Sequence, residues 1–416
     1  MSSRRAEGKS AATNRYRYGL LAAAAYLLYA VLMRVLWMPL HAAGVGQPVT
    51  GYLNGLGWVL QMPGAFAARR LGVTGHPYLL GNWLVGLALN VPVYFLLGVL
   101  CGALWSRARP RAEPGVTPVP SRRRFLKTSL RVVSGGAAAG LAYAFVAEPR
   151  WYTITRRTFP VRDLPPALEG LRLVQLTDIH HGPWLSLGYV REVVQACNAL
   201  RPDLVLLTGD YILQSSAYAR PVVEELAQLR PAIGTLAVLG NHDWAEGGGL
   251  IGLIGQQFAA AGLPLIDNDR KVLTPGRELV DGAAEGLALC GVGDLWRGGP
   301  DPRQALEGLP PAMPRLLLSH NPDVAEGRRF VRSGLRVDLM ICGHTHGGQV
   351  YIPGIGRPFV PSRYGEKYAH GLVRGPACPV FVCSGLGMAT VPLRIGVPPE
   401  IAVLELRRAA ADGETS

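Results

Sequence analysis

A strand-like apolar run that ends in a single carboxylate most constrains how this chain can fold. Residues 204–207 are four consecutive apolar residues, the pattern of a strand buried on both faces, as in parallel sheets. The run stops at Gly209 and Asp210. In open α/β sheets, ligands bind just past the carboxyl ends of the strands. The pattern therefore predicts an α/β domain and places Asp210 where a bound group would lie.

Four other strand-like runs end in residue types that bind metal ions. The polar residues that follow them are Asp178 and His180, then Asn241, His242 and Asp243, then His320, then His344 and His346. Residues two apart in an extended chain point the same way, so Asp178 and His180 are expected to face one ion. The absence of sulfur among these residues favours Mn, Fe or Zn in octahedral-like sites over a thiolate zinc site.

The number of candidate ligands suits two ions that share one carboxylate. Two cations that lie close together need a negative group between them, and the central Asp210 is the expected bridge. Such a pair binds a phosphoryl group, lowers the pKa of a bridging water and stabilises both the attacking and the leaving oxygen.

Strand-like and helix-like patterns alternate through the C-terminal part of the chain. Strands are expected at 171–176, 204–207, 235–239, 287–292, 315–318, 337–342, 380–383 and 401–406. Helices are expected at 189–200, 220–229, 250–261 and 322–333. In the first of these, Val190, Val193, Val194 and Cys197 recur at helical spacing.

The ordered motifs D-x-H, GD, GNHD, H and GHTH resemble those of the calcineurin-like metallophosphoesterases, over about 170–346 and on to about 406. The resemblance implies a four-layer α-β-β-α sandwich with two facing mixed sheets. It implies one metal held by Asp178, His180, Asp210 and His346, and another held by Asp210, Asn241, His320 and His344. It also implies that Asn241 and His242 contact the phosphate and that His242 protonates the leaving oxygen, with Asp243 orienting its ring.

The C-terminal tail resembles a bacterial membrane-associated subgroup of that family, which includes exported proteins and enzymes that cleave the pyrophosphate of a nucleotide-linked lipid precursor. The matching residues are Gly347, Gly348, Gln349, Tyr364, Gly385, Leu386, Gly387, Pro392, Arg394, Pro398, Pro399 and Glu400. Arg394 could clamp a phosphate bidentately, or it could be a structural arginine that pairs with Glu400 or a carbonyl. His181 is expected at the surface or the pocket rim, and Asp294 is expected to be structural.

Residues 1–148 have the pattern of a membrane region. The apolar runs 19–40 and 78–105 suit membrane-spanning helices, with buried core helices as the alternative. Segment 121–127 (SRRRFLK) resembles the twin-arginine export signal, and the apolar stretch 132–147 after it could be a third span or could contain a cleavage site at 142–144. A soluble domain at 149–410 and a flexible tail at 411–416 are expected to follow.

The excess of positive over negative charge in the chain is confined to this region. Residues 1–148 hold 16 of the 42 Lys and Arg residues and 3 of the 29 Asp and Glu residues, which accounts for the whole net charge of +13. The neutral remainder argues against nucleic-acid binding. By the positive-inside rule, a crossing at 132–147 would place the C-terminal domain on the outer face of a bacterial inner membrane, in a multi-pass protein. Without that crossing the domain would be cytoplasmic.

Two functions stay open from the sequence. The first is hydrolysis of phosphoester or pyrophosphate bonds in lipid-linked or membrane-proximal substrates, by a hydroxide that two divalent metal ions activate, with the twin-arginine export machinery as a further partner. The alternative is a non-catalytic metal-binding scaffold or receptor at the membrane, which would need no acid at His242. Six cysteines without a CxxC pair, Cys101, Cys197, Cys290, Cys342, Cys378 and Cys383, are expected to be buried free thiols.

Overall fold

Two mixed β-sheets face each other in the computed structural model, which describes residues 140, 142–213, 215–244, 250–389 and 391–409. The expected spans at 19–40 and 78–105, the segment 121–127, the tail 411–416 and most of the stretch 132–147 lie outside these residues. Among the residues described, none of the helices has both the length and the apolar character needed to cross a bilayer. Residues 144–416 cluster as one compact unit, separate from residues 1–143.

The first sheet has, within the described residues, five strands in the order β1-β12-β2-β3-β4. Their bounds are Thr153–Val161 for β1, Glu400–Arg408 for β12, Arg172–Leu176 for β2, Leu204–Thr208 for β3 and Gly234–Val238 for β4. Strands β2, β3 and β4 are parallel, while β12 runs antiparallel to β2 and parallel to β1. The carboxyl ends of β2, β3 and β4 therefore lie at one edge.

The second sheet has, over the same described residues, seven strands in the order β10-β11-β9-β8-β7-β5-β6. Their bounds are Gly371–Arg374 for β10, Pro379–Val382 for β11, Leu339–Cys342 for β9, Arg315–Leu318 for β8, Leu287–Gly291 for β7, Arg270–Leu273 for β5 and Leu279–Val280 for β6. Strands β7, β8, β9 and β11 are parallel, and β10, β5 and β6 pair antiparallel at the margins.

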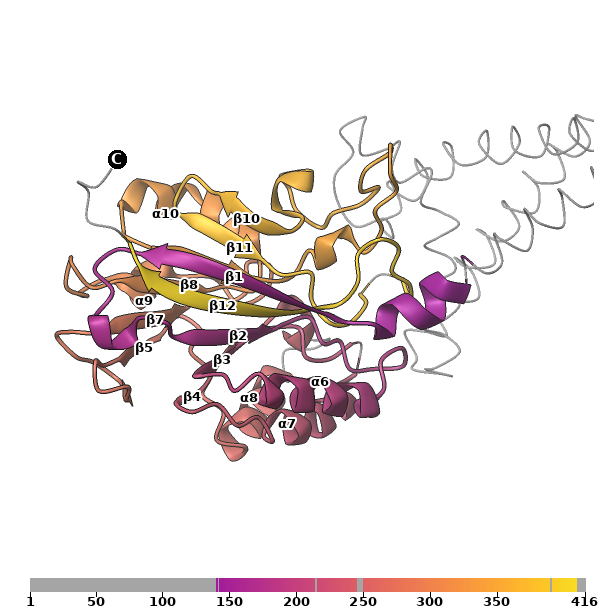
Figure 1. Ribbon diagram of the computed structural model, residues 1–416, viewed down its shortest axis with the longest axis horizontal. Coiled ribbons are helices and arrows are strands. Elements are labelled where there is room, and N and C mark those ends of the chain that lie inside the picture. Colours follow the sequence, from indigo (N-terminus) through magenta and orange to yellow (C-terminus); the bar gives the residue numbers. More distant parts are fainter. Residues whose placement is uncertain (1–139, 141, 214, 245–249, 390, 410–416) are drawn as a thin grey trace, which may run out of the picture. The chain divides into compact units, whose positions relative to one another are not determined.

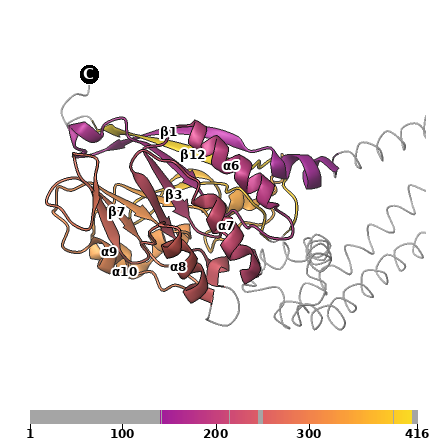
Figure 2. The same cartoon turned by 90° about the horizontal axis from the view of Figure 1, so that it is seen from below.

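Helices cover the outer face of each sheet (Figure 1). Helices α6 (Leu187–Ala199), α7 (Ala219–Leu226) and α8 (Leu250–Ala260) lie side by side on the first sheet (Figure 2). On the second sheet lie α9 (Pro302–Leu306), α10 (Arg328–Ser333) and the 3-10 helix η7 (Pro322–Glu326). Short turns elsewhere are η2 (Tyr143–Ala147), η3 (Glu148–Arg150), η4 (Pro166–Leu168), η5 (Ser216–Tyr218), η6 (Asn241–Trp244), η8 (His346–Gly348) and η9 (Gly365–Tyr368).

The apolar core is divided by the two sheets into three clusters. Between the sheets, Leu204 and Leu206 of β3 pack with Leu316 of β8. The alternate residues of β3, Val205 and Leu207, point the other way and pack under α6 and α7. Strand β3 is buried at every position, as its continuous apolar run predicts for a strand covered on both faces.

The prediction of one continuous helix over residues 322–333 is wrong. The structure forms the 3-10 turn η7 and then the separate helix α10. Gly327 lies between them with an extended backbone conformation, φ −61° and ψ 116°, and this residue ends the first turn. The new helix restarts after it with Arg328.

Candidate metal centre

Side chains from the carboxyl ends of four strands converge at one buried point between the two sheets. The ligand atoms of Asp178, His180 and His346 lie within 4.8 Å of one another. Those of Asp210, His320 and His344 form a second such group. Strands β2 and β3 belong to the first sheet and β8 and β9 to the second, so each sheet contributes part of the centre.

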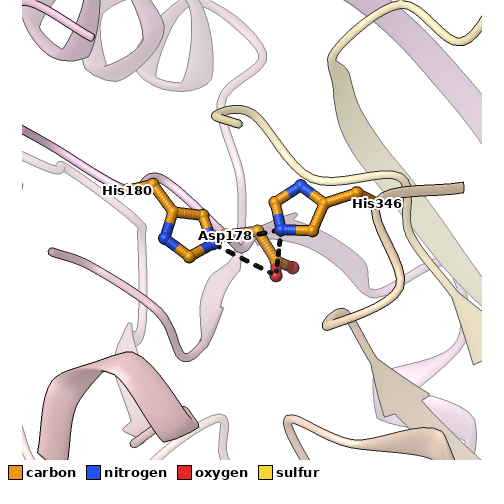
Figure 3. A group of neighbouring side chains, drawn as sticks. All are labelled: Asp178, His180 and His346. Carbon is orange, nitrogen blue, oxygen red and sulfur yellow. Dashed lines mark hydrogen bonds and ion pairs between the residues drawn. The ribbon is translucent and has the colours of Figure 1, made fainter. Parts of the chain in front are cut away.

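The first group consists of one carboxylate and two imidazoles from β2 and β9 (Figure 3). The Nε2 atom of His346 lies 3.2 Å from Oδ1 of Asp178, and the Nε2 atom of His180 lies 3.9 Å from the same oxygen. The two Nε2 atoms are 3.0 Å apart. Imidazole nitrogens that face a carboxylate oxygen at these distances, in a fully buried place, form a donor set for a cation.

The second group has its imidazoles fixed in a ligand orientation. Nδ1 of His320 donates to the carbonyl oxygen of Thr208 at 2.8 Å, which directs Nε2 of the same ring at Oδ2 of Asp210, 3.1 Å away. This is the arrangement by which outer partners orient a metal-binding histidine. The Nδ1 atom of His344 lies 3.2 Å from Nε2 of His320.

Asp210 lies between the two groups. Its Oδ2 atom is 3.1 Å from Nε2 of His320 in the second group and 3.4 Å from Nε2 of His180 in the first. Its other oxygen, Oδ1, accepts the backbone N–H of His242 at 2.8 Å, which holds the carboxylate in place. This is the position that the sequence predicted for a bridging carboxylate.

A buried polar atom without a protein partner fits the binding of a cation at the centre. Oδ1 of Asn241 is buried and has no hydrogen-bond partner among the described residues. A buried polar atom without a partner costs about 1–3 kcal/mol. An amide oxygen is a suitable metal ligand, so the donor set of these residues fits divalent metal ions.

The backbone conformation at the ligands differs from the extended chain that the sequence spacing predicts. Five of the candidate ligands adopt positive φ: Asp178 (52°), His180 (51°), Asp210 (56°), His344 (70°) and His346 (51°). Each such residue costs about 1–2 kcal/mol relative to ordinary backbone conformations. Side chains two apart do converge, but through tight left-handed turns after each strand. Such strain clusters at functional sites.

Two motif glycines are required by close approach. A Cβ atom on Gly240 would collide with the carboxylate and backbone nitrogen of Asp210. A Cβ atom on Gly343 would collide with the side chains of Asp178 and Thr177. The first residues of GNHD and GHTH are thus glycines because a candidate ligand occupies the space of their missing side chain.

The electrostatics of the centre are those of a site made for cations. Burial raises the pKa of Asp178, but His346 beside it outweighs burial and holds the pKa below its usual value. Burial lowers the pKa of His320, but Asp210 outweighs it and raises that pKa to about 10. Burial and then His320 lower the pKa of His344 to about 3. Carboxylates here stay ionised, and His344 stays neutral as a ligand must.

His242 lies at the margin of the centre. It is partly exposed, its ring is perpendicular to that of His180 with centroids 4.9 Å apart, and one of its nitrogens lies within 4.8 Å of the ligand atoms of His180 and Asp210. A partly exposed imidazole beside the two ligand groups can reach a bound substrate.

Asp243 does not act on the ring of His242 as expected. It is fully buried, and its carboxylate accepts backbone N–H groups of Gly240, Asp210 and Tyr211, each at 2.8 Å. Consecutive residues in the turn η6 point in different directions, so Asp243 faces inward while His242 faces the centre. Through these hydrogen bonds Asp243 joins the loop after β3 to the loop after β4.

The contacts of Arg394 favour the structural alternative over the phosphate clamp. The side chain is fully buried, and its guanidinium donates to the carbonyl oxygens of Ser384, Gly385, Gly387 and Val397. Burial lowers its pKa to about 10. Its donors are used by backbone carbonyls, apart from a 3.4 Å approach of Nη2 to Nδ1 of His346, so we do not retain it as a substrate contact.

His181 does not lie at the surface, and Asp294 has hydrogen bonds of the structural kind that the sequence predicts. His181 is buried, with Nδ1 2.9 Å from the carbonyl oxygen of Leu185 and its ring against Tyr218. Asp294 is buried and accepts the backbone N–H groups of Trp296 and Arg297 at 2.7 and 2.9 Å. The five cysteines among the described residues are free and buried, as expected, and Cys101 lies outside those residues.

Trp296 is a residue of the site that sequence reasoning missed. Its indole is half-exposed and packs perpendicular to the ring of His344, with centroids 4.5 Å apart. The turn that Asp294 closes after β7 presents it there. The sequence does contain a signal for Trp296: it follows Asp294 by two residues, just past the end of the expected strand at 287–292.

Comparisons with known proteins agree with this geometry. The family model of the calcineurin-like phosphoesterases matches residues 171–348. The chain is 33% identical to the phosphodiesterase YaeI of Escherichia coli over 292 residues, which cover 69% of this chain and 99% of that protein. It is 31% identical to a transmembrane protein with a metallophosphoesterase domain from Danio rerio, over 76% of this chain and 70% of that protein.

A more distant relative carries a lipid-related name. The UDP-2,3-diacylglucosamine pyrophosphatase LpxG of Chlamydia trachomatis is 25% identical over 264 residues, which cover 55% of this chain and 79% of that protein. From the ordered motifs, the convergent ligands and these relatives, we conclude that the chain belongs to the calcineurin-like phosphoesterase family and is a metallophosphoesterase that hydrolyses phosphoester bonds.

Proposed function

We propose that the chain cleaves phosphoester or pyrophosphate bonds of lipid-linked or membrane-proximal substrates at a centre of two divalent ions, Mn, Fe or Zn. Asp178, His180, Asp210 and His346 would hold one ion, and Asp210, Asn241, His320 and His344 would hold the other. When bound, the ions would supply charge for the phosphoryl oxygens and a hydroxide at neutral pH. The observation that carries the proposal is the Asp210 carboxylate between the two ligand groups.

The protein's own side chains would complete the reaction. Asn241 and His242 would contact the phosphoryl group, because both follow β4 at the margin of the centre. The imidazole of His242 would give a proton to the leaving oxygen, as general acid catalysis requires. Asp243 would act on the reaction indirectly, by fixing the loop that carries both Asp210 and His242.

The lipid-linked substrate class is supported by three observations. The relative LpxG is named as a pyrophosphatase of a UDP-linked diacylglucosamine, and another relative is named as a transmembrane protein. The apolar runs of residues 1–148 predict a membrane region, which would raise the local concentration of lipid substrates. We propose an inner-membrane protein with a twin-arginine-like signal at 121–127 and the domain 149–410 on the outer face.

The test of the activity uses the full chain with Mn, Fe or Zn. We expect hydrolysis of diphenyl phosphate, whose phenolate leaving group is a strong enough base to need a proton, and we expect that chelation removes this activity and that His242→Ala lowers it by about 100-fold, the usual contribution of a general acid. If the chain binds metal yet hydrolyses neither aryl monoesters nor diesters, the scaffold alternative holds. Unchanged cellular function of His242→Ala with metal still bound would also favour the scaffold.

The test of the orientation is a reporter fused after Ser416. Activity of an exported reporter, such as alkaline phosphatase, is expected, because a crossing at 132–147 leaves the C-terminus outside. Activity of a cytoplasmic reporter would contradict the export signal. It would favour a nucleotide-linked lipid precursor as the substrate, since such precursors are made inside the cell.

A further inference from the structure

Exposed apolar side chains gather at one end of the domain. Val146, Trp151 and Ile355 have exposed fractions of 59%, 69% and 64%. Tyr351, Ile352 and Pro353 are also exposed, in the same hairpin as Ile355. We call these six residues the apolar rim. Exposed apolar patches of this kind mark interaction sites on otherwise polar proteins.

Hydrogen bonds join the segments that carry the rim. The backbone N–H of Arg394 donates to the carbonyl oxygen of Ala144 at 3.0 Å, and that of Tyr351 donates to the carbonyl oxygen of Ile395 at 2.7 Å. The N–H of Val397 donates to Oε1 of Glu148 at 2.9 Å. Segment 394–397 therefore lies between the turns at 144–150 and the hairpin at 351–356.

The rim lies at the end of the domain where the metal centre lies. Strand β1 begins opposite Glu400, and the carboxyl end of β2 pairs with Ala402, so the start of β1 and the end of β2 share one edge. Figure 1 shows the purple turns before β1 at that end, on the right. The hairpin lies near His346, because Nε of Arg357, just after the hairpin, donates to the carbonyl oxygen of Gly347 at 2.8 Å.

Cationic groups stand among these apolar side chains. The guanidinium of Arg357 lies 5.0 Å from the ring centroid of Tyr351. Arg150 is exposed beside Trp151. Aromatic and aliphatic residues mixed with Lys and Arg are typical of surfaces that lie in the interface of anionic bilayers.

The chain outside the described domain also leaves from this end. The domain begins at Ala144, and the residues before it include the apolar stretch that starts at 132. A bilayer anchored through that stretch would lie next to the rim. The exposed residues of α10 do not have this position, because α10 lies away from the start of β1 (Figure 1).

We propose that the apolar rim docks into the surface of a lipid bilayer, so that the metal centre opens toward phosphate groups at the level of the lipid head groups. This inference rests on the proposed phosphohydrolase function and narrows its substrate to lipids presented from a bilayer. The rim supplies apolar contact with the acyl boundary, and Arg150 and Arg357 attract anionic head groups.

The docking is tested without reference to activity. The full chain with Cys101→Ser and Ile355→Cys carries an environment-sensitive nitrobenzoxadiazole label and is reconstituted in phosphatidylcholine–phosphatidylglycerol vesicles. We expect quenching when brominated lipids replace ordinary ones. The control is Val331→Cys on α10, with an exposed fraction of 38%, which should not be quenched. A label at 355 that is not quenched, whether solvated or covered by another part of the chain, overturns the proposal, and so does equal quenching at 331.

The consequence for activity is tested with Ile352→Asp/Ile355→Asp in the full chain. Because buried charges weaken interfacial binding, we expect about tenfold slower hydrolysis of a diacylglycerol p-nitrophenyl phosphate in vesicles. Hydrolysis of soluble bis(p-nitrophenyl) phosphate should be unchanged, since neither side chain belongs to the metal centre. Equal rates on both substrates overturn the docking proposal. If the unmodified chain hydrolyses neither substrate, the proposed function fails, and the quenching experiment still decides the docking.

Discussion

Asp210 is the residue on which the two halves of the centre depend. Its Oδ2 atom faces Nε2 of His180 on one side and of His320 on the other. Asp210→Asn keeps the shape of the side chain and removes the charge between the two cations. Removal of a hydrogen-bond partner of a metal ligand already lowers metal affinity or activity 10–100-fold. We therefore expect Asp210→Asn to lower kcat by more than about 100-fold and to lose one bound ion per chain.

Metal content by mass spectrometry, measured together with kcat on a soluble diester, checks this prediction. The matched control is Asp301→Asn, which removes a carboxylate that caps α9 away from the centre. Retention of two ions per chain by Asp210→Asn would mean that this carboxylate is no bridge.

The raised pKa of His320 predicts that metal binding releases a proton. Although burial works against it, Asp210 raises the pKa of His320 to about 10, so this imidazole carries a proton at neutral pH before a metal ion binds. The ion must displace that proton, and the apparent affinity should therefore rise with pH toward 10. Calorimetric titration with Zn in buffers of different ionisation enthalpy measures the released proton. A binding heat that does not depend on the buffer at pH 7.5 would contradict the prediction.

At the scale of secondary structure, the sequence predicts the central strands well and the marginal strands poorly. The continuous apolar runs of β3 and β8 identify them, because a strand covered on both faces has no polar position. Strand β1 was not predicted. It is mostly exposed, carries Arg156 and Arg157, and contains Pro160, all of which suit an edge strand. Its place depends on β12, at the far end of the chain.

The composition of the site could be predicted, but its side-chain directions could not. The residue types after each strand identify the candidate ligands, since strand ends meet at one edge. The left-handed turns at Asp178 and His344 depend on contacts between loops, which local spacing does not contain. The same holds for Asp243, whose carboxylate binds backbone groups of a loop 33 residues earlier in the sequence.

Glu400, the first residue of β12, links several elements at the metal end of the domain. Its carboxylate accepts from Oγ1 of Thr155 at 2.6 Å and from the N–H of Ser384 at 2.8 Å, and it pairs with His370 at 3.1 Å. Burial raises the pKa of Glu400, but His370, Ser384 and Thr155 outweigh it and lower the pKa to about 2.

The lowered pKa of Glu400 predicts how stability depends on pH. The contribution of this group is present above its unfolded pKa of 4.5 and is lost as the pH falls toward 2. Its upper limit is on the order of 3 kcal/mol of unfolding free energy. Glu400→Gln should lower the stability at pH 7 and flatten the pH dependence between 4.5 and 2. Urea unfolding with chelator present measures the unfolding free energy at each pH. An unchanged pH dependence in Glu400→Gln would exclude Glu400 as the cause of the loss of stability in acid.

For the molecule as a whole, the metal centre joins the two sheets. Asp178, His180 and Asp210 follow strands of the first sheet, whereas His320, His344 and His346 follow strands of the second. Between the sheets lies an apolar core, and Nε2 of Gln175 on β2 donates across it to the carbonyl oxygen of Cys342 on β9 at 2.9 Å, near the centre. A bound ion would therefore fix the sheets relative to each other at this edge.

We accordingly predict that metal stabilises the folded domain. Ions at 100 times their Kd add about 2.7 kcal/mol per site, and for a domain of this size each kcal/mol raises Tm by about 2–4 °C. Chelation should therefore lower Tm by roughly 5–10 °C per site, and readdition of Zn or Mn should restore it. Asp210→Asn should lose about half of this response, because it is expected to lose one of the two ions. Differential scanning calorimetry of the full chain decides the matter: if chelation abolishes hydrolysis while Tm stays constant, the ions bind without joining the two sheets.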